Sequence, residues 1–323
     1  MPAKSKPTLD IIVLNYNGWD LLKECLPSVM EEAEQYSGIA RVYVLDNAST
    51  DKSVENVKQY FPQAGVIAND KNEYMFAYNK AIKNSQAQYV MVLNNDIKLN
   101  KSCLDNLMVH FEANHIIFAV QPLFLEWDGQ GINGGQRICH TGPERGFFEF
   151  GTTKNVTKAV HTIAASGSCI YDRNKFVQLG GYDELFYPAY YEDSDISWRA
   201  WDRGWPSLFE PKATLLHKNH ATLDIILKSD VNRKILLKSN QLVFMWRHMN
   251  GNKFWVRHIC LFVPRLMLWD YKNGKFIWTR AAIKAMSKIN DIIKRKLHNP
   301  QKRTAEEIIN DTKVIYIIPY KCT

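Results

Sequence analysis

Short apolar runs alternate with amphipathic stretches over the first hundred residues. Four runs rich in β-branched residues predict buried strands, at residues 9–14, 41–45, 65–68 and 89–93. The stretches between them have helical spacing and predict helices over residues 18–34, 51–60 and 77–85. Continuously apolar strands that alternate with helices are typical of βαβ units around a parallel sheet.

Polar residues directly follow three of these strands, at residues 15–18, 46–51 and 94–96. Parallel sheets bind ligands beyond the carboxyl ends of their strands, so all three clusters should meet at one edge. Asn, Asp and Gly also dominate ordinary turns, which is the simpler explanation for any single cluster. Three clusters after consecutive strands favour a binding site instead.

Two nucleotide-binding motifs are absent from the sequence. No GxGxxG follows the first strand and no GxxxxGK[ST] occurs anywhere, which argues against a dinucleotide-binding Rossmann enzyme and a P-loop NTPase. The pattern loosens after residue 115, and the glycines at 129–135 predict a loop.

The densest polar segment is residues 180–205. A helix is predicted over residues 194–203, and Glu192, Asp193 and Asp195 stand at its start, where free N–H groups and the helix dipole favour ionised carboxylates. These acids either serve only the helix terminus or include a carboxylate that takes a proton from a hydroxyl nucleophile.

Taken together, the motifs resemble the inverting nucleotide-sugar glycosyltransferases of the GT-A fold in glycosyltransferase family two, in particular bacterial, rhamnosyltransferase-like members. Their order and spacing agree over residues 8–222. The matching segments are NYNG at 15–18, VLDNASTD at 44–51, VLNND at 92–96, ASGSCIYDR at 165–173, GGYDELF at 180–186, YEDSDISWR at 191–199, and His217. The resemblance implies an α/β GT-A domain with a mixed, mainly parallel sheet over residues 1–222, followed by a helical basic region over 223–323.

Four residues match donor-binding positions of that family. Asn17 and Asp46 match contacts to the nucleotide base and ribose, Asn47 lies beside them, and Asn79 fits the Asn that opens the next helix. Met75 departs from the family, because glycine is usual there and lets the backbone approach the donor.

The family's metal and catalytic positions are matched as well. Asn94 and Asp96 match the ends of the DxD-type motif, which holds Mn²⁺ or Mg²⁺ on the donor diphosphate, and His217 matches a histidine that supports the metal. Asp193 matches the catalytic base. A packed histidine is the alternative for His217.

Three further residues are candidates for the acceptor site, Glu192, Asp195 and Trp198. The two acids flank the expected base, and the indole could stack on a sugar. Half-buried packing on the helix explains Trp198 equally well.

Composition refines this picture. The chain of 323 residues is 46% hydrophobic and 23% charged, which is typical of a globular protein. Its net charge of +8 is uneven: residues 221–323 carry +13 and residues 1–220 carry −5. The basic region also contains four tryptophans, so it is interpreted as core packing with a solvated face, as a surface for anionic lipid, or as a nucleic-acid surface. The acidic body argues against nucleic acid.

The sequence therefore predicts an enzyme that moves a sugar from a nucleoside-diphosphate donor to a glycan or lipid-linked acceptor. Scattered cysteines and a polar N-terminus favour a cytoplasmic protein, held peripherally on the inner face of the membrane by its basic region. The alternative is a non-catalytic relative that binds a nucleotide sugar or a glycan.

Overall fold

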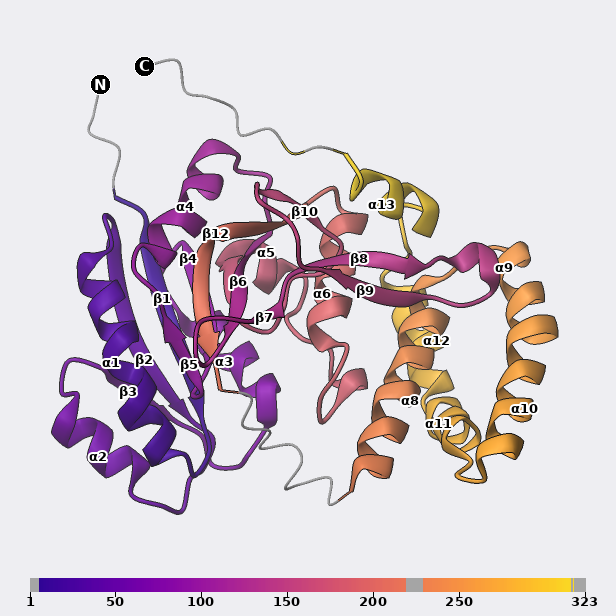
Figure 1. Cartoon of the computed structure of the whole chain (residues 1–323), viewed down its shortest axis with the longest axis horizontal. Helices are drawn as coiled ribbons and strands as arrows, with labels where there is room; N and C mark the ends of the chain where they lie inside the picture. Colours follow the sequence, from indigo (N-terminus) through magenta and orange to yellow (C-terminus); the bar gives the residue numbers. More distant parts are fainter. Residues whose placement is uncertain (1–5, 219–228, 315, 317–323) are drawn as a thin grey trace.

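The computed structural model describes residues 6–218, 229–314 and 316. Within this part of the chain, a ten-stranded sheet forms the centre of the molecule, in the order β10-β12-β6-β11-β4-β1-β2-β3, with β5 against β12 and β7 against β6 (Figure 1). Its strands are β1 (Thr8–Asn15), β2 (Ile39–Asp46), β3 (Gly65–Ala68), β4 (Tyr89–Asn94), β5 (Ile97–Leu99), β6 (Ala119–Glu126), β7 (Ile132–Gly134), β10 (Val160–Thr162), β11 (Cys169–Asp172) and β12 (Ser207–His217).

The four predicted strands form the parallel half of this sheet. β1 pairs in parallel with both β2 and β4, and β2 pairs in parallel with β3. β1 is buried on both faces: Ile11 and Val13 belong to one hydrophobic cluster and Ile12 to the other. This two-sided burial is why these strands are continuous apolar runs in the sequence.

The other half of the sheet is mixed. β11 runs antiparallel to β4 and β6, whereas β12 runs parallel to β6. β7 pairs with β6 inside the glycine-rich stretch that the sequence predicts as a loop, so the prediction was wrong for residues 132–134. The mixed, mainly parallel α/β sheet expected from the sequence is confirmed.

Helices cover both faces of the sheet. Those of the first 218 residues are α1 (Trp19–Gln35), α2 (Ser53–Tyr60), α3 (Ala77–Asn84), α4 (Cys103–Ala113), α5 (Arg173–Gln178) and α6 (Glu192–Asp202). α1 and α4 pack on the face of Ile11 and Val13, and α3 and α6 pack on the face of Ile12. The predicted helices at 18–34, 51–60, 77–85 and 194–203 correspond to α1, α2, α3 and α6.

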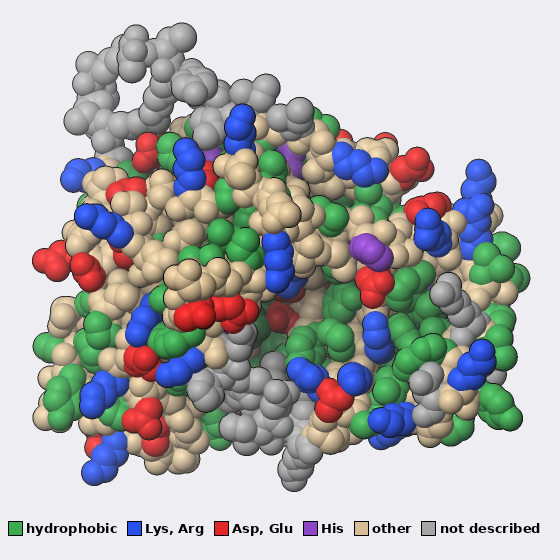
Figure 2. Space-filling view, viewed as in Figure 1, with side chains coloured by type: hydrophobic (Ala, Val, Ile, Leu, Met, Phe, Trp, Pro, Cys, Tyr) green, Lys and Arg blue, Asp and Glu red, His purple; other side chains and the backbone are tan. Residues whose placement is uncertain are grey.

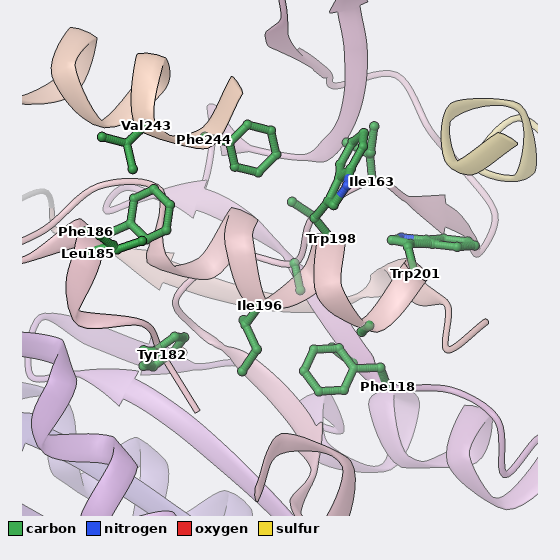
Figure 3. Packing of buried hydrophobic residues seen from close by; sticks show 14 of the residues in the cluster. Phe118, Ile163, Tyr182, Leu185, Phe186, Ile196, Trp198, Trp201, Val243 and Phe244 are labelled. Carbon is green, nitrogen blue, oxygen red and sulfur yellow. The ribbon is translucent and has the colours of Figure 1, made fainter. Parts of the chain in front are cut away.

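A group of helices follows residue 229. It consists of α8 (Asp230–His248), α9 (Asn252–Arg257), the π-helix η4 (His258–Phe262), α10 (Val263–Asn273), α11 (Ile277–Met286), α12 (Ile289–His298) and α13 (Ala305–Asp311). These helices share a hydrophobic cluster with the sheet domain: Trp198 of α6 packs edge-on against Phe244 of α8, with ring centroids 5.5 Å apart (Figure 3). The helical character predicted for this region is confirmed, and the predicted boundary at 222 lies outside the described residues.

A β-hairpin links the two parts of the molecule. β8 (Gln136–Thr141) and β9 (Glu149–Thr153) pair antiparallel and reach across to α9 (Figure 1). At the tip of the hairpin, His258 Nδ1 lies 2.7 Å from the carbonyl oxygen of Gly146, and Phe147 stacks on Phe262. The hairpin therefore holds the C-terminal helices to the sheet domain.

Candidate functional site

The carboxyl ends of β1, β2 and β4 bring the three polar clusters together. Asn15 Nδ2 donates to Asp46 Oδ1 at 3.2 Å, and Asn95 Nδ2 donates to Asn15 Oδ1 at 2.8 Å. These contacts join one residue from each cluster, so the predicted meeting of the clusters is confirmed. Figure 2 shows a hollow with acidic side chains deep within it near the middle of one face of the molecule.

At this edge, Asn17 and Asp46 order the turn that follows β2. Asn17 Oδ1 accepts from the backbone N–H groups of Thr50 (2.6 Å) and Asp51 (3.2 Å). Asp46 accepts from the backbone N–H and the hydroxyl of Ser49. The two residues therefore fix the turn at residues 49–51, beside the predicted donor-binding positions.

Asn47 connects β2 to the next loop. Its Nδ2 donates to the carbonyl oxygen of Tyr74 at 2.9 Å, and its Oδ1 accepts from Asn69 Nδ2 at 2.9 Å. In that loop, Met75 lies over Gly167, because a β-carbon added to Gly167 would come within 2.7 Å of the methionine methyl group. The methionine that departs from the family pattern thus fills space beside another matching segment, residues 165–173.

Asn79 does not point freely into this edge. Its Oδ1 accepts from the backbone N–H of Tyr182 at 2.8 Å, and its Nδ2 donates to the carbonyl oxygen of Tyr182 at 2.9 Å. Both polar groups of the side chain are therefore used to hold the 181–182 turn against α3. The structure gives Asn79 a positioning role, and a direct donor contact stays a prediction.

Asp96 and His217 meet because β5 and β12 pair antiparallel, with His217 opposite Ile97. His217 Nε2 lies 3.4 Å from Asp96 Oδ2. The buried Nδ1 of His217 has no hydrogen-bond partner within the described residues. Asn94 ends β4 two residues before Asp96.

The side chains of Asn94, Asp96 and His217 fit a divalent cation that is also coordinated by a bound diphosphate. No group of three or more His, Cys, Asp and Glu side chains suited to a metal occurs among the residues that the structure describes. One carboxylate, one imidazole and one amide oxygen would fill only part of the coordination shell of such a cation. The remaining coordination positions would be available to the oxygens of a diphosphate.

Asp193 lies in the first turn of α6, as predicted, and forms an ion pair with Arg137 of β8. Arg137 Nη1 is 3.0 Å from Asp193 Oδ2 and 3.0 Å from Ser194 Oγ. Asp193 Oδ1 accepts from the backbone N–H and the hydroxyl of Ser194. Arg137 could not be predicted from the sequence, because a single arginine in a strand of mixed polarity carries no signal of its partner.

Between the groups around Asp193 and around β4 lies β11. Cys169 of β11 pairs with Val92 of β4, two residues before Asn94. Burial raises the pKa of the buried Cys169 thiol, so the thiol is not a nucleophile at neutral pH.

Glu192 is a buried neighbour of Asp193. Its side chain is buried, and its Oε2 has no hydrogen-bond partner among the described residues. Burial, with a smaller effect of the Asp193 charge, raises the pKa of Glu192. The two adjacent carboxyl groups therefore lie in different environments, one without a partner and one ion-paired with Arg137.

The structure places Asp195 and Trp198 in the core, which argues against acceptor contact for both. Asp195 accepts from Arg199 Nε and lies 2.7 Å from His248 Nε2 and 2.9 Å from Arg247 Nη1. Burial acts to raise the pKa of Asp195, but Arg199, Arg247 and His248 outweigh it, so the net shift is downward.

Trp198 is fully buried. Its ring packs against Phe148, with centroids 5.4 Å apart. It also packs against Phe244, at 5.5 Å (Figure 3). The alternative of packing on the helix agrees with this position, although the ring is fully buried and not half-buried as expected.

Known proteins resemble this chain in sequence and in fold. A family model described as glycosyl transferase family 2 matches residues 10–180. The N-acetylglucosaminyl-diphospho-decaprenol L-rhamnosyltransferase of Mycobacterium tuberculosis is 25% identical over 244 residues, covering 66% of this chain and 77% of the relative.

Two solved structures superpose on most of the chain. GalNAc-T7 with UDP, GalNAc and Mn²⁺ gives a TM-score of 0.61 at 16% identity, over 92% of this chain and 59% of that one. The mannosyltransferase PcManGT of Pyrobaculum calidifontis, with GDP-Man and Mn²⁺, gives 0.53 at 14% identity, over 96% of this chain and 87% of that one. These likenesses show the fold, and the family model covers more than half of the chain. The chain therefore belongs to glycosyl transferase family 2 and is a glycosyltransferase with a GT-A-like fold.

Proposed function

We propose that this glycosyltransferase moves a sugar from a nucleoside-diphosphate donor to a hydroxyl group of a lipid-linked glycan, with inversion at the anomeric carbon. The observation that carries the proposal is the carboxylate of Asp193, ion-paired with Arg137 at the start of α6 and beside the buried Glu192. The M. tuberculosis relative is named for an acceptor joined through diphosphate to a polyprenol, which supports the acceptor class. The nucleotides bound by the two solved neighbours support the donor class.

Asp193 acts in this proposal as the general base. Its carboxylate takes the proton of the acceptor hydroxyl while the hydroxyl oxygen forms a bond to the anomeric carbon. The bond from that carbon to the donor diphosphate breaks, and the nucleoside diphosphate leaves with the electron pair. Attack from the face opposite the leaving group inverts the configuration. Arg137 orients the Asp193 carboxylate.

Asn94, Asp96 and His217 would hold a divalent cation, Mn²⁺ or Mg²⁺. When bound, such a cation supplies positive charge that stabilises the departing diphosphate. The solved neighbours contain Mn²⁺, which supports this assignment. Asp96 and His217 approach each other at the sheet edge as two ligands of one ion would need to do.

The donor nucleoside would lie against the turn ordered by Asn17 and Asp46, with Asn47 behind it. Asn79 would act through Tyr182, whose backbone it holds. On the acceptor side, Glu192 is the remaining candidate, because burial raises its pKa and a protonated carboxyl group could donate a hydrogen bond beside the base.

The proposed arrangement has a catalytic domain over residues 1–222 and a helical region over 223–323 that associates with anionic lipid on the cytoplasmic face of the membrane. In the described part of the chain, no helix combines the length and the hydropathy required to cross a bilayer. The charge of +13 on residues 221–323 supports a peripheral attachment.

The proposal is tested by measuring nucleotide release from a panel of UDP-, GDP- and dTDP-sugars with Mn²⁺ and a glycosyl-diphospho-polyprenol acceptor. We expect one donor to give acceptor-dependent release, and Asp193→Asn to lower it by a factor of about 10²–10⁴ while nucleotide binding persists. Binding without release from any donor would instead support a non-catalytic relative, an outcome that the unusual Met75 would help to explain.

A further inference from the structure

An exposed apolar surface covers the helical stretch formed by α9, η4 and α10. Among the side chains that the structure describes, eight of the large exposed hydrophobic residues lie within residues 256–276, compared with five in residues 6–218. Leu268 is 63% exposed and Tyr271 is 81% exposed. We call this the α9–α10 surface; its exposed apolar members are Val256, Ile259, Leu261, Val263, Leu268, Trp269 and Tyr271.

The helices of this surface are anchored along one narrow line. Phe254, His258 and Phe262 recur every four residues and are buried. His258 bonds to Gly146, and Phe262 stacks on Phe147 and packs edge-on against Trp278 of α11. Because this line holds the helices in a fixed rotation, the apolar side chains outside it cannot turn inward. Their exposure is a property of the folded molecule.

The described exposed charges on the helices of this surface have one sign. Residues 252–276 contain a single acidic residue, Asp270, against five Lys and Arg residues. Asp270 is buried and accepts from the backbone N–H groups of Trp278 and Thr279 at 3.1 and 2.6 Å. Lys253, Lys272 and Lys275 are exposed. Basic and hydrophobic side chains gather along α10, the outermost helix at the right of the view (Figures 1 and 2).

We propose that the α9–α10 surface lies on an anionic lipid bilayer, with its apolar side chains in the interfacial region and its lysines at the lipid phosphates. An apolar helix face whose own exposed charges are cations fits such a surface. A second copy of the chain fits less well, because a symmetric contact would bring the same cations together in a low-dielectric interface. The proposed function places the membrane contact in residues 223–323, and this inference assigns it to the α9–α10 surface. The biological purpose of the contact rests on the proposed function.

The hairpin gives this surface a direct structural route to the catalytic residues. The β8–β9 hairpin contacts η4 at its tip through Gly146 and Phe147, and it carries Arg137, the partner of Asp193, near its base. A bilayer against α10 would therefore be held at a fixed position relative to the base, as an enzyme acting on a lipid-linked sugar requires.

Vesicle co-sedimentation of the full chain, without donor or acceptor, tests the docking surface independently of catalysis. Vesicles of phosphatidylcholine alone are compared with vesicles of phosphatidylcholine and phosphatidylglycerol in equal parts, at low and high salt. We expect binding to the anionic vesicles only, weakened by salt. Lys253→Gln and Lys272→Gln should each lower the partition coefficient about fivefold. Leu268→Glu should lower it at least about tenfold.

Ile116→Glu is the matched control, because Ile116 is an exposed apolar residue of the sheet domain and its replacement should leave vesicle binding unchanged. Circular dichroism verifies that each variant is folded. Equal binding to both kinds of vesicle, or wild-type binding by Leu268→Glu, would overturn the proposal. Dimerisation in sedimentation velocity that Leu268→Glu abolishes, without lipid binding, would assign the surface to a second copy. Vesicle binding in a chain that releases no nucleotide would reject the proposed function but retain the surface.

Discussion

Arg137 on β8 and Asp193 on α6 form an ion pair with an N–O distance of 3.0 Å, although 55 residues separate them in the sequence. The same guanidinium also reaches Ser194 Oγ, so it holds the first turn of α6 from outside the helix. The carboxylate proposed as the base is thereby positioned by a hairpin that also contacts the C-terminal helices.

Replacing Arg137 by Gln should impair catalysis more than binding. Without the guanidinium, the first turn of α6 loses the side chain that fixes the orientation of the Asp193 carboxylate. We expect kcat to fall by a factor of about 10–100, with the donor KM nearly unchanged. The measurement is the rate of acceptor-dependent nucleotide release at varied donor concentration.

Two further variants make the Arg137 experiment specific. Arg137→Lys keeps the charge and should restore much of kcat, whereas Arg145→Gln removes an exposed arginine from the same hairpin and should change nothing. A kcat of Arg137→Gln equal to that of the wild type would show that the ion pair does not position the base.

Asp96 and His217 should determine metal-dependent nucleotide binding. Their side chains approach within 3.4 Å, so both would contact one cation. We expect His217→Ala to weaken nucleotide binding in the presence of Mn²⁺ about 10–100-fold, and Asp96→Ala to abolish the effect of Mn²⁺. Titration calorimetry with a nucleoside diphosphate, with Mn²⁺ and with a chelator, measures this. Exposed His115 is the control, and loss of binding that is the same with and without Mn²⁺ would argue against a metal role.

The parallel half of the fold could be predicted from the sequence, and much of the rest could not. β1 and β4 are buried on both faces, so each is a continuous apolar run, and the Asn and Asp residues after them mark the functional edge. Arg137 gave no such signal, because its partner is set by tertiary contact between the hairpin and α6. The burial of Trp198 could not be predicted either, because the face of α6 that carries it is covered by α8. That helix begins at Asp230, far along the chain from α6.

Trp198 should prove important for stability. Its indole is fully enclosed by aromatic rings from α8 and the hairpin, so Trp198→Ala would leave a large cavity. We expect a loss of about 3–5 kcal/mol in the free energy of unfolding, and a smaller loss for Trp198→Phe. Urea denaturation measures both. If the indole stacked on a sugar instead, Trp198→Phe would raise the acceptor KM with little effect on stability.

His248 should make the protein less stable in mild acid. It is fully buried beside Asp195, and burial lowers its pKa from 6.5 to about 4, although the contact with Asp195 opposes this shift. Between about pH 6.5 and pH 4, the unfolded chain therefore binds a proton at this residue that the folded chain does not bind. The contribution of His248 to stability is present above the unfolded pKa and is lost as the pH falls through this interval.

His248→Gln removes this titration and can still donate a hydrogen bond to Asp195. The variant should be less stable than the wild type at neutral pH, but its free energy of unfolding should depend less steeply on pH between about 6.5 and 4. The difference in slope should approach 1.4 kcal/mol per pH unit. Urea denaturation across this interval measures it, with His115→Gln as the exposed control. Parallel curves for His248→Gln and the wild type would mean that His248 is protonated in the folded protein, and the network around Asp195 would then carry one more positive charge than we infer.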